Sequence, residues 1–147
     1  MEKQAQVLVV DDEAVWRNKL AKILEDKGYL VCKAATYRGA MRWLKGRGFH
    51  LAVIDVNLAD APVDKRGEPE DISGMNIIAK IRERAIEQDM SVIIVTGFGT
   101  ARLTREAFKK LDVFDVILKQ DFDLEEFRSL VSDAIALALY KTPGENL

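Results

Sequence analysis

Three aspartates directly follow apolar runs of this sequence. The run Leu51–Ile54 ends in Asp55, and the run Val7–Val10 ends in Asp11 and Asp12. Apolar runs without alternation predict strands buried on both faces of a parallel sheet, and ligands bind at the carboxyl ends of such strands. Three carboxylates gathered there repel one another unless a cation offsets their charge. Because oxygen-only ligands suit hard ions, the pattern predicts a site for Mg²⁺ or a similar cation.

Two further polar residues stand where later strands are predicted to end. Thr96 closes the segment 91–96, and Lys119 follows the segment 113–118. In one parallel sheet, their side chains emerge at the same end as the aspartates. Each residue also has a plainer interpretation. An acidic pair after a strand is often a helix cap, Lys119 alone would be a solvated strand end, and Thr96 before a glycine would be an ordinary turn.

The segments that must position these residues alternate between strand and helix patterns. Gly28 is predicted to end the first helix, Thr36 to cap the second, and Asp123 with Glu126 to form a capping box for the last. The sequence therefore predicts an α/β fold, a doubly wound five-stranded parallel sheet with helices on both faces. The predicted strands span about 7–10, 29–35, 51–54, 91–96 and 113–118, and the helices contain Leu20, Ile23 and Leu24; Ala40 and Leu44; Ile78, Ile81 and Ala85; Leu103, Ala107, Phe108 and Leu111; and Phe127, Leu130, Val131, Ala134 and Ala138.

The composition is that of an ordinary globular domain. With 147 residues, 48% hydrophobic and 31% charged, and a net charge of −2, the chain has no basic excess, so we do not expect it to bind nucleic acid by itself. Cys32 is its only cysteine, which excludes an intrachain disulfide. No apolar run is long enough to span a bilayer, and the N-terminus lacks a signal-peptide apolar region. These features predict a cytoplasmic protein that does not contact membranes.

The domain organisation is predicted to be simple. We expect one domain over residues 1–147, with a core of about 6–140 and a tail of 141–147 that is too short for an effector domain. The interval 59–73, rich in Asp, Glu, Pro and Gly, is long for a strand-to-helix loop, where a handful of residues is usual. We expect this inserted loop either to cover the site or to make a separate contact.

The ordered set of polar residues resembles the receiver domain of two-component response regulators. Asp11 and Asp12 after the first strand, Asp55 after the third, Thr96 after the fourth and Lys119 after the fifth carry the resemblance, which covers nearly the whole chain. The family has a flavodoxin-like fold of the chemotaxis-regulator type, which agrees with the predicted architecture.

The resemblance implies a role for each of these residues. Asp55 matches the phosphoacceptor, Asp12 a direct Mg²⁺ ligand, Asp11 an outer ligand acting through water, Asn57 the position whose backbone carbonyl binds the metal, Thr96 the hydroxyl that binds the phosphoryl group, and Lys119 the lysine that pairs with it. Phosphoryl transfer needs an in-line nucleophile and positive charge around the equatorial oxygens, which this set would supply.

The resemblance further implies a phosphorylation switch in signal transduction. A sensor histidine kinase or a histidine phosphotransfer protein would donate the phosphoryl group, and a conformational change would reach an output target that the sequence does not identify. Such a phosphoprotein is not a conventional enzyme, although it catalyses its own phosphorylation and dephosphorylation. Two alternatives stay open: a Mg²⁺-dependent phosphohydrolase with an aspartyl intermediate, although that class places a second aspartate where this chain has Asn57, and a phosphorylation-independent interaction module.

Two positions depart from the family pattern. Gln120 follows Lys119 where family members usually have a proline after a cis peptide bond, and a cis bond before a non-proline residue costs ~3 kcal/mol. Val116 stands where many receivers have the aromatic residue that couples to the threonine, so that coupling is not expected in its usual form. The resemblance also implies that Trp16 borders the metal and phosphoryl site, whereas Trp43 does not.

Overall fold

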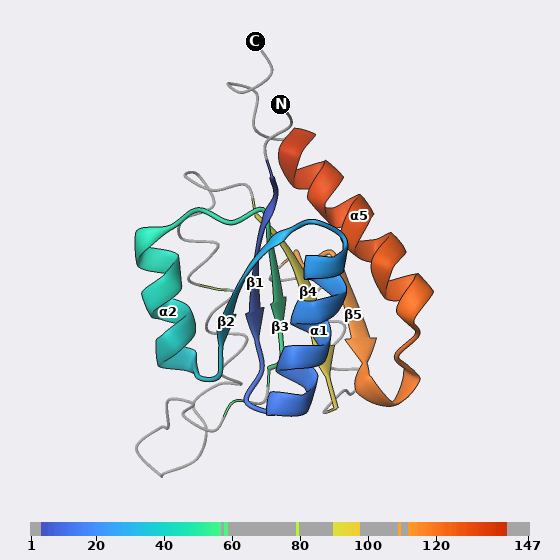
Figure 1. The fold of residues 1–147 in the computed structure, drawn as a ribbon, viewed down its shortest axis with the longest axis horizontal. Helices are drawn as coiled ribbons and strands as arrows, with labels where there is room; N and C mark the ends of the chain where they lie inside the picture. Colours follow the sequence, from blue (N-terminus) through green and yellow to red (C-terminus); the bar gives the residue numbers. More distant parts are fainter. Residues whose placement is uncertain are drawn as a thin grey trace.

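The strands form one parallel sheet. The computed structural model describes residues 4–56, 58, 79, 90–97, 109 and 112–140. Within them, five strands lie in the order β2-β1-β3-β4-β5, and every neighbouring pair is parallel (Figure 1). The strands are β1 (Gln6–Val10), β2 (Leu30–Ala34), β3 (Leu51–Ile54), β4 (Ser91–Thr96) and β5 (Asp115–Leu118). The helices are α1 (Ala14–Asp26), α2 (Tyr37–Gly46) and α5 (Leu124–Tyr140), with a short 3₁₀ turn, η1 (Lys119–Asp121). The predicted fold class is confirmed.

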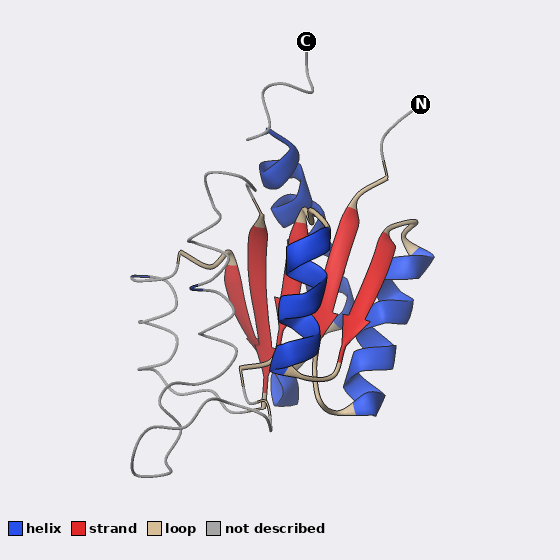
Figure 2. Cartoon of the chain, turned by 90° about the vertical axis from the view of Figure 1, so that its left-hand side faces the viewer, coloured by secondary structure: helices blue, strands red, loops and turns tan. Residues whose placement is uncertain are grey.

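Helices cover both faces of the sheet, as Figure 2 shows. Successive residues of a strand point to opposite faces. On β1, Leu8 and Val10 therefore join the core under α2, whereas Val7 and Val9 join the core under α1 and α5. Both sets are buried, which explains why the strand sequence is apolar without alternation. Phe127 of α5 is the largest fully buried side chain among the described residues and anchors that helix to the sheet.

The predicted helix ends are confirmed where the structure describes them. Gly28 has φ of 91°, a left-handed conformation that favours glycine, and its N–H bonds to the Glu25 carbonyl at the end of α1 (2.9 Å). The Thr36 hydroxyl accepts the Gly39 N–H (2.9 Å) at the start of α2. Asp123 accepts the Glu126 N–H (2.9 Å), which is one half of the predicted capping box.

One predicted strand boundary is wrong, and several predicted segments are not described by the structure. The last strand begins at Asp115 rather than at residue 113, although the Phe114 N–H already donates to the Val92 carbonyl (2.7 Å). The two middle helices apart from residues 79 and 109, the inserted loop 59–73, the tail 141–147 and Asn57 lie outside the described residues. Among the helices that the structure describes, none is both long and apolar enough to cross a membrane.

Candidate phosphoacceptor site

Strand register places two aspartates side by side. Val10 of β1 is level with Ile54 of β3, and Asp11 and Asp55 are the residues that follow them. The Asp55 N–H donates to the Val10 carbonyl (2.8 Å), so the pairing continues one step past the strands. Both carboxylates are almost completely buried, with exposed fractions of 1% for Asp11 and 4% for Asp55. The carboxyl end of the sheet thus carries two buried aspartates, whose negative charges require a compensating positive charge.

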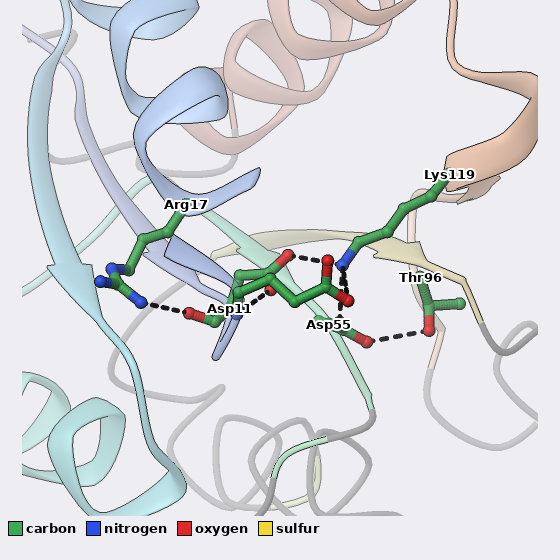
Figure 3. A network of polar contacts seen from close by, with 6 residues as sticks. Asp11, Arg17, Asp55, Thr96 and Lys119 are labelled. Carbon is green, nitrogen blue, oxygen red and sulfur yellow. Dashed lines mark hydrogen bonds and ion pairs between the residues drawn. The ribbon is translucent and has the colours of Figure 1, made fainter. Parts of the chain in front are cut away.

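Both carboxylate oxygens of Asp55 are engaged by side chains from neighbouring strand ends (Figure 3). The Thr96 hydroxyl, at the end of β4, donates to Asp55 Oδ1 (2.8 Å), and Thr96 is fully buried. The Lys119 ammonium, just after β5, donates to Asp55 Oδ2 (2.9 Å). The structure therefore brings together Asp55, Thr96 and Lys119, which the sequence predicted to share one end of the sheet.

Lys119 is the central cation of the site. Its Nζ also lies 3.0 Å from Asp11 Oδ2 and 3.5 Å from Glu13 Oε1, and its side chain is only 8% exposed. Burial by itself lowers the pKa of Lys119, but the hydrogen bonds and negative charges of Asp55 and Asp11 outweigh that effect and hold the pKa above its ordinary value. Lys119 is therefore fully protonated at neutral pH.

Asp11 serves two purposes with its two oxygens. Oδ1 accepts the Glu13 N–H (2.9 Å), which closes a turn just before α1; Glu13 is the N-cap of that helix, so the helix-cap interpretation of Asp11 is wrong. Oδ2 is buried and, although it lies close to the Lys119 ammonium, it has no well-directed hydrogen bond from the described residues. Burial raises the pKa of Asp11, the Glu13 and Lys119 contacts oppose that rise, and the Asp55 charge adds to it. The charged form of Asp11 is thus only partly compensated.

The acidic cluster fits a divalent cation. Carboxylate oxygens of Asp11, Asp12 and Asp55 lie within 4.8 Å of one another, and Asp12 is exposed whereas the other two are buried. The under-compensated Asp11 Oδ2 points to the same conclusion, and an all-oxygen donor set suits Mg²⁺. The exposed Asp12 leaves the cluster open to solvent on one side, so hydrated ions can reach it.

An aromatic cluster flanks Lys119. The Trp16 ring centroid lies 5.3 Å from Lys119 Nζ, which agrees with the expectation that Trp16 borders the site. Trp16 packs edge-to-face on Phe122 (centroids 5.3 Å apart), and Phe122 packs on the buried Phe127 at the same distance. Trp43 lies elsewhere, with its Nε1 donating to the Lys33 carbonyl on β2 (3.0 Å).

The departures from the family pattern have structural counterparts. No cis peptide bond occurs in the described part of the chain, so the bond between Lys119 and Gln120 is trans, and Lys119 nevertheless reaches both acids. Val116 is partly buried against the core under α2.

Sequence reasoning missed Glu13 and Arg17. Arg17 Nη1 donates to the Asp11 carbonyl (3.0 Å), and only its position one helical turn past the acidic pair could have suggested this contact.

The fold and this site define a class of protein: an α/β domain in which a lysine pairs with buried aspartates at the carboxyl end of a parallel sheet. A sequence profile described as the response regulator receiver domain matches residues 7–132. The chain belongs to the response regulator receiver domain family, and is thus a receiver of two-component signalling.

Known relatives agree with this assignment. The chain is 29% identical over 141 residues to the acid tolerance regulatory protein ActR of Rhizobium meliloti (strain 1021), covering 96% of this chain and 61% of ActR. It is 32% identical over 116 residues to a putative response regulator NtrX-like protein of Rickettsia conorii, covering 79% of this chain and 22% of that protein. The chain thus spans less than two thirds of the length of these relatives.

Solved structures show the same fold. A CheY-like receiver domain protein from Methanospirillum hungatei JF-1 superposes with a TM-score of 0.79 at 20% identity, covering 95% of this chain and 99% of that one. A response regulator receiver protein from Pseudomonas putida superposes with a TM-score of 0.73 at 28% identity, covering 90% of this chain and 99% of that one. The likeness extends over nearly the whole chain.

Proposed function

We propose that Asp55 is the phosphoacceptor of this receiver. The observation that carries the proposal is the engagement of both its oxygens, Oδ1 by the Thr96 hydroxyl and Oδ2 by the Lys119 ammonium, beside the acidic cluster. These two donors can stabilise the negative charge of a transferred phosphoryl group without a large rearrangement of the site. Phosphorylation on aspartate is general to the family.

The proposed reaction is a direct transfer. One carboxylate oxygen of Asp55 attacks phosphorus, the bond between phosphorus and the donor's histidine nitrogen breaks, and the imidazole leaves with that electron pair. Thr96 and Lys119 then turn from the carboxylate oxygens to the new phosphoryl oxygens. In the return step, water attacks phosphorus, the Asp55 carboxylate leaves, and inorganic phosphate is released.

We propose that Asp11, Asp12 and Asp55 hold Mg²⁺, together with the backbone carbonyl of Asn57, which lies outside the described residues. The ion, when bound, would supply positive charge that offsets the negative charge of the phosphoryl group. Asp11 has a buried oxygen available for this purpose, and Asp12 is exposed at the entrance. Lys119 already spans Asp11 and Asp55, so the ammonium and the ion would share these carboxylates.

Partners and domain organisation follow as further proposals. The donor is a sensor histidine kinase or a histidine phosphotransfer protein, since receivers generally exchange phosphoryl groups with such proteins and act on output domains. We propose that residues 6–140 form one receiver unit. Val116 stands in place of the aromatic residue of the usual threonine-to-aromatic coupling, so we expect output through another route.

Intact-mass measurement tests the phosphoacceptor. After incubation with acetyl phosphate and Mg²⁺, the protein should gain one base-labile phosphoryl group, and Asp55→Asn should gain none because an amide is not a competent nucleophile. Asp133→Asn, an exposed change on α5, is the matched control and should be labelled like the parent. Labelling of Asp55→Asn at the parent rate would place the acceptor elsewhere, and multiple turnover of a phosphomonoester would favour a phosphohydrolase.

A further inference from the structure

Basic residues gather in one part of the chain. Residues 27–54 contain six lysines and arginines and no aspartate or glutamate, whereas the rest of the chain, with 16 basic and 24 acidic residues, carries a net charge of −8. The overall charge of −2 therefore conceals a strong separation. The acid-free stretch contains β2 and α2, which lie next to each other at one side of the sheet (Figure 1). β2 is an edge strand, with β1 as its only strand neighbour in the described sheet.

A groove runs between this edge strand and α2. It encloses about 550 Å³, within the size range of ligand-binding clefts. Three cations line it, Lys33 from β2, Arg42 from α2 and Arg47 from the C-cap of α2. Alanine and glycine residues, together with Trp43, make up the remainder of its lining. The groove is therefore basic and aromatic, and its small residues leave room for a bound chain.

The cations of the groove form no ion pair with the acidic residues that the structure describes. Among the described residues, no ion pair involves Lys33, Arg42 or Arg47, and all three are exposed. Lys33 Nζ donates to a neutral amide, Asn18 Oδ1 (3.4 Å). Three exposed cations around one groove concentrate positive potential there, which attracts acidic groups and repels basic ones.

The aromatic side chain of the groove is held in place. Trp43 Nε1 donates to the Lys33 carbonyl (3.0 Å), and the Arg47 guanidinium lies 5.4 Å from the indole centroid. Arg47 Nη1 also contacts Cys32 Sγ (3.1 Å). Ordered tryptophan and arginine side chains are frequent anchors of protein interfaces because little conformational entropy is lost when they bind.

We propose that this groove, lined by Lys33, Arg42, Trp43 and Arg47, binds an extended acidic segment of a partner protein. The three cations come from different backbone elements: Lys33 from β2, Arg42 from within α2, and Arg47 from the extended residue that follows α2. Cations supplied from several points of the lining suit the several carboxylates of one acidic chain. The site lies beside α2 and is separate from the Asp55 pocket, so it adds a second contact surface to the receiver.

Fluorescence of Trp43 tests the proposal. In a Trp16→Phe background, an acetylated and amidated hexaglutamate peptide should change the Trp43 emission saturably, and added salt should weaken binding. The variant Lys33→Glu/Arg42→Glu should lower the affinity about tenfold or more, because each reversal replaces an attraction by a repulsion of similar size. Lys33 and Arg42 are both exposed, so the double variant should fold.

The control variant makes the same change in net charge at two positions outside the groove. Lys27→Glu/Lys45→Glu alters two exposed lysines of the same acid-free stretch that do not line the groove. This variant should bind the peptide within about twofold of the parent affinity if the groove is the site. An equal loss in both variants, or no saturable change in the parent, would overturn the proposal. Tighter binding of ATP or of single-stranded oligothymidylate than of the peptide would assign the groove to nucleotides or nucleic acid instead.

Discussion

Replacing Lys119 with methionine should strongly destabilise the receiver when no metal is bound. The change keeps most of the side-chain stem and removes only the ammonium group. Two almost fully buried carboxylates, Asp11 and Asp55, then lose the cation that lies 3.0 and 2.9 Å from them. The pKa of Lys119 is raised, so its contribution to stability is fully present below the ordinary lysine pKa and is lost only as the pH rises through the higher folded value. At neutral pH the whole contribution is therefore removed.

The expected loss is about 3 kcal/mol. At an effective dielectric of about 20, one ion pair at 3 Å is worth about 5 kcal/mol before desolvation is subtracted. Breaking a buried pair by removing one partner typically costs 3–5 kcal/mol. The lower end applies because Asp12, beside the pair, is exposed, so water can reach the carboxylates once the ammonium is gone. Asp11, whose pKa is already raised by burial, can also take up a proton.

Urea denaturation at pH 7.5 in EDTA measures this loss, and a double-mutant cycle assigns it. Asp55→Asn removes one of the two charges that Lys119 compensates, so Lys119→Met should cost about 1–2 kcal/mol less in that background than in the parent. Mg²⁺ at about 10 mM should restore part of the stability of Lys119→Met by binding the acidic cluster. A loss below about 1 kcal/mol in EDTA, or strictly additive single changes, would refute the central role given to Lys119.

Three further outcomes are expected. Mg²⁺ at about 10 mM should stabilise the parent by about 1.4 kcal/mol if its dissociation constant is ~1 mM, and Asp12→Ala should abolish this response in thermal melts; identical parent melts with Mg²⁺ and with chelator would contradict it. Emission of Trp16 in a Trp43→Phe variant should change on addition of Mg²⁺ or beryllofluoride, because the ring lies 5.3 Å from Lys119 Nζ, whereas a signal that survives in Trp16→Phe would contradict the site geometry. Ser91→Ala should cost about 1 kcal/mol in urea denaturation because the Ser91 hydroxyl donates to the Ala134 carbonyl (2.8 Å) and joins β4 to α5; a change within experimental error would mean that water replaces this bond.

The sequence predicts this fold well because an unbroken apolar run marks a buried strand, and the order of these runs along the chain gives the order of the strands. An apolar run that faces two helix layers cannot alternate, so β1 and β3 are visible directly in the sequence. The residue after each run must then lie at the carboxyl end of the sheet. For this reason Asp11 and Asp55 could be placed together from the sequence, and the register of β1 with β3 agrees. Helix ends were predictable at Gly28 and Thr36 because backbone conformation and side-chain capping restrict the residue type there.

Contacts made by long side chains were less predictable. Glu13 Oε1 lies 3.5 Å from Lys119 Nζ, and Arg17 donates to the Asp11 carbonyl, but both residues stand at the start of α1, where charged residues are common without any such role. His50, just before β3, is half-buried and its Nδ1 accepts the Gln6 N–H (3.0 Å), a contact that no motif in the sequence indicates. A strand spacing or a motif reports backbone position, whereas these contacts depend on rotamers and on chain segments far apart in sequence.

The placement of Lys119 shows how one receiver can keep its site without the usual proline. Lys119 begins the turn η1, and the Phe122 N–H bonds back to the Lys119 carbonyl (3.3 Å), so the backbone that carries the lysine is tied to Phe122. Phe122 is held in turn between Trp16 of α1 and the fully buried Phe127 of α5. Aromatic contacts of this geometry contribute about 0.5–1.5 kcal/mol each beyond the area they bury. The turn therefore gains through packing the rigidity that a proline would provide through its ring, and the ammonium group reaches Asp55 from a trans backbone.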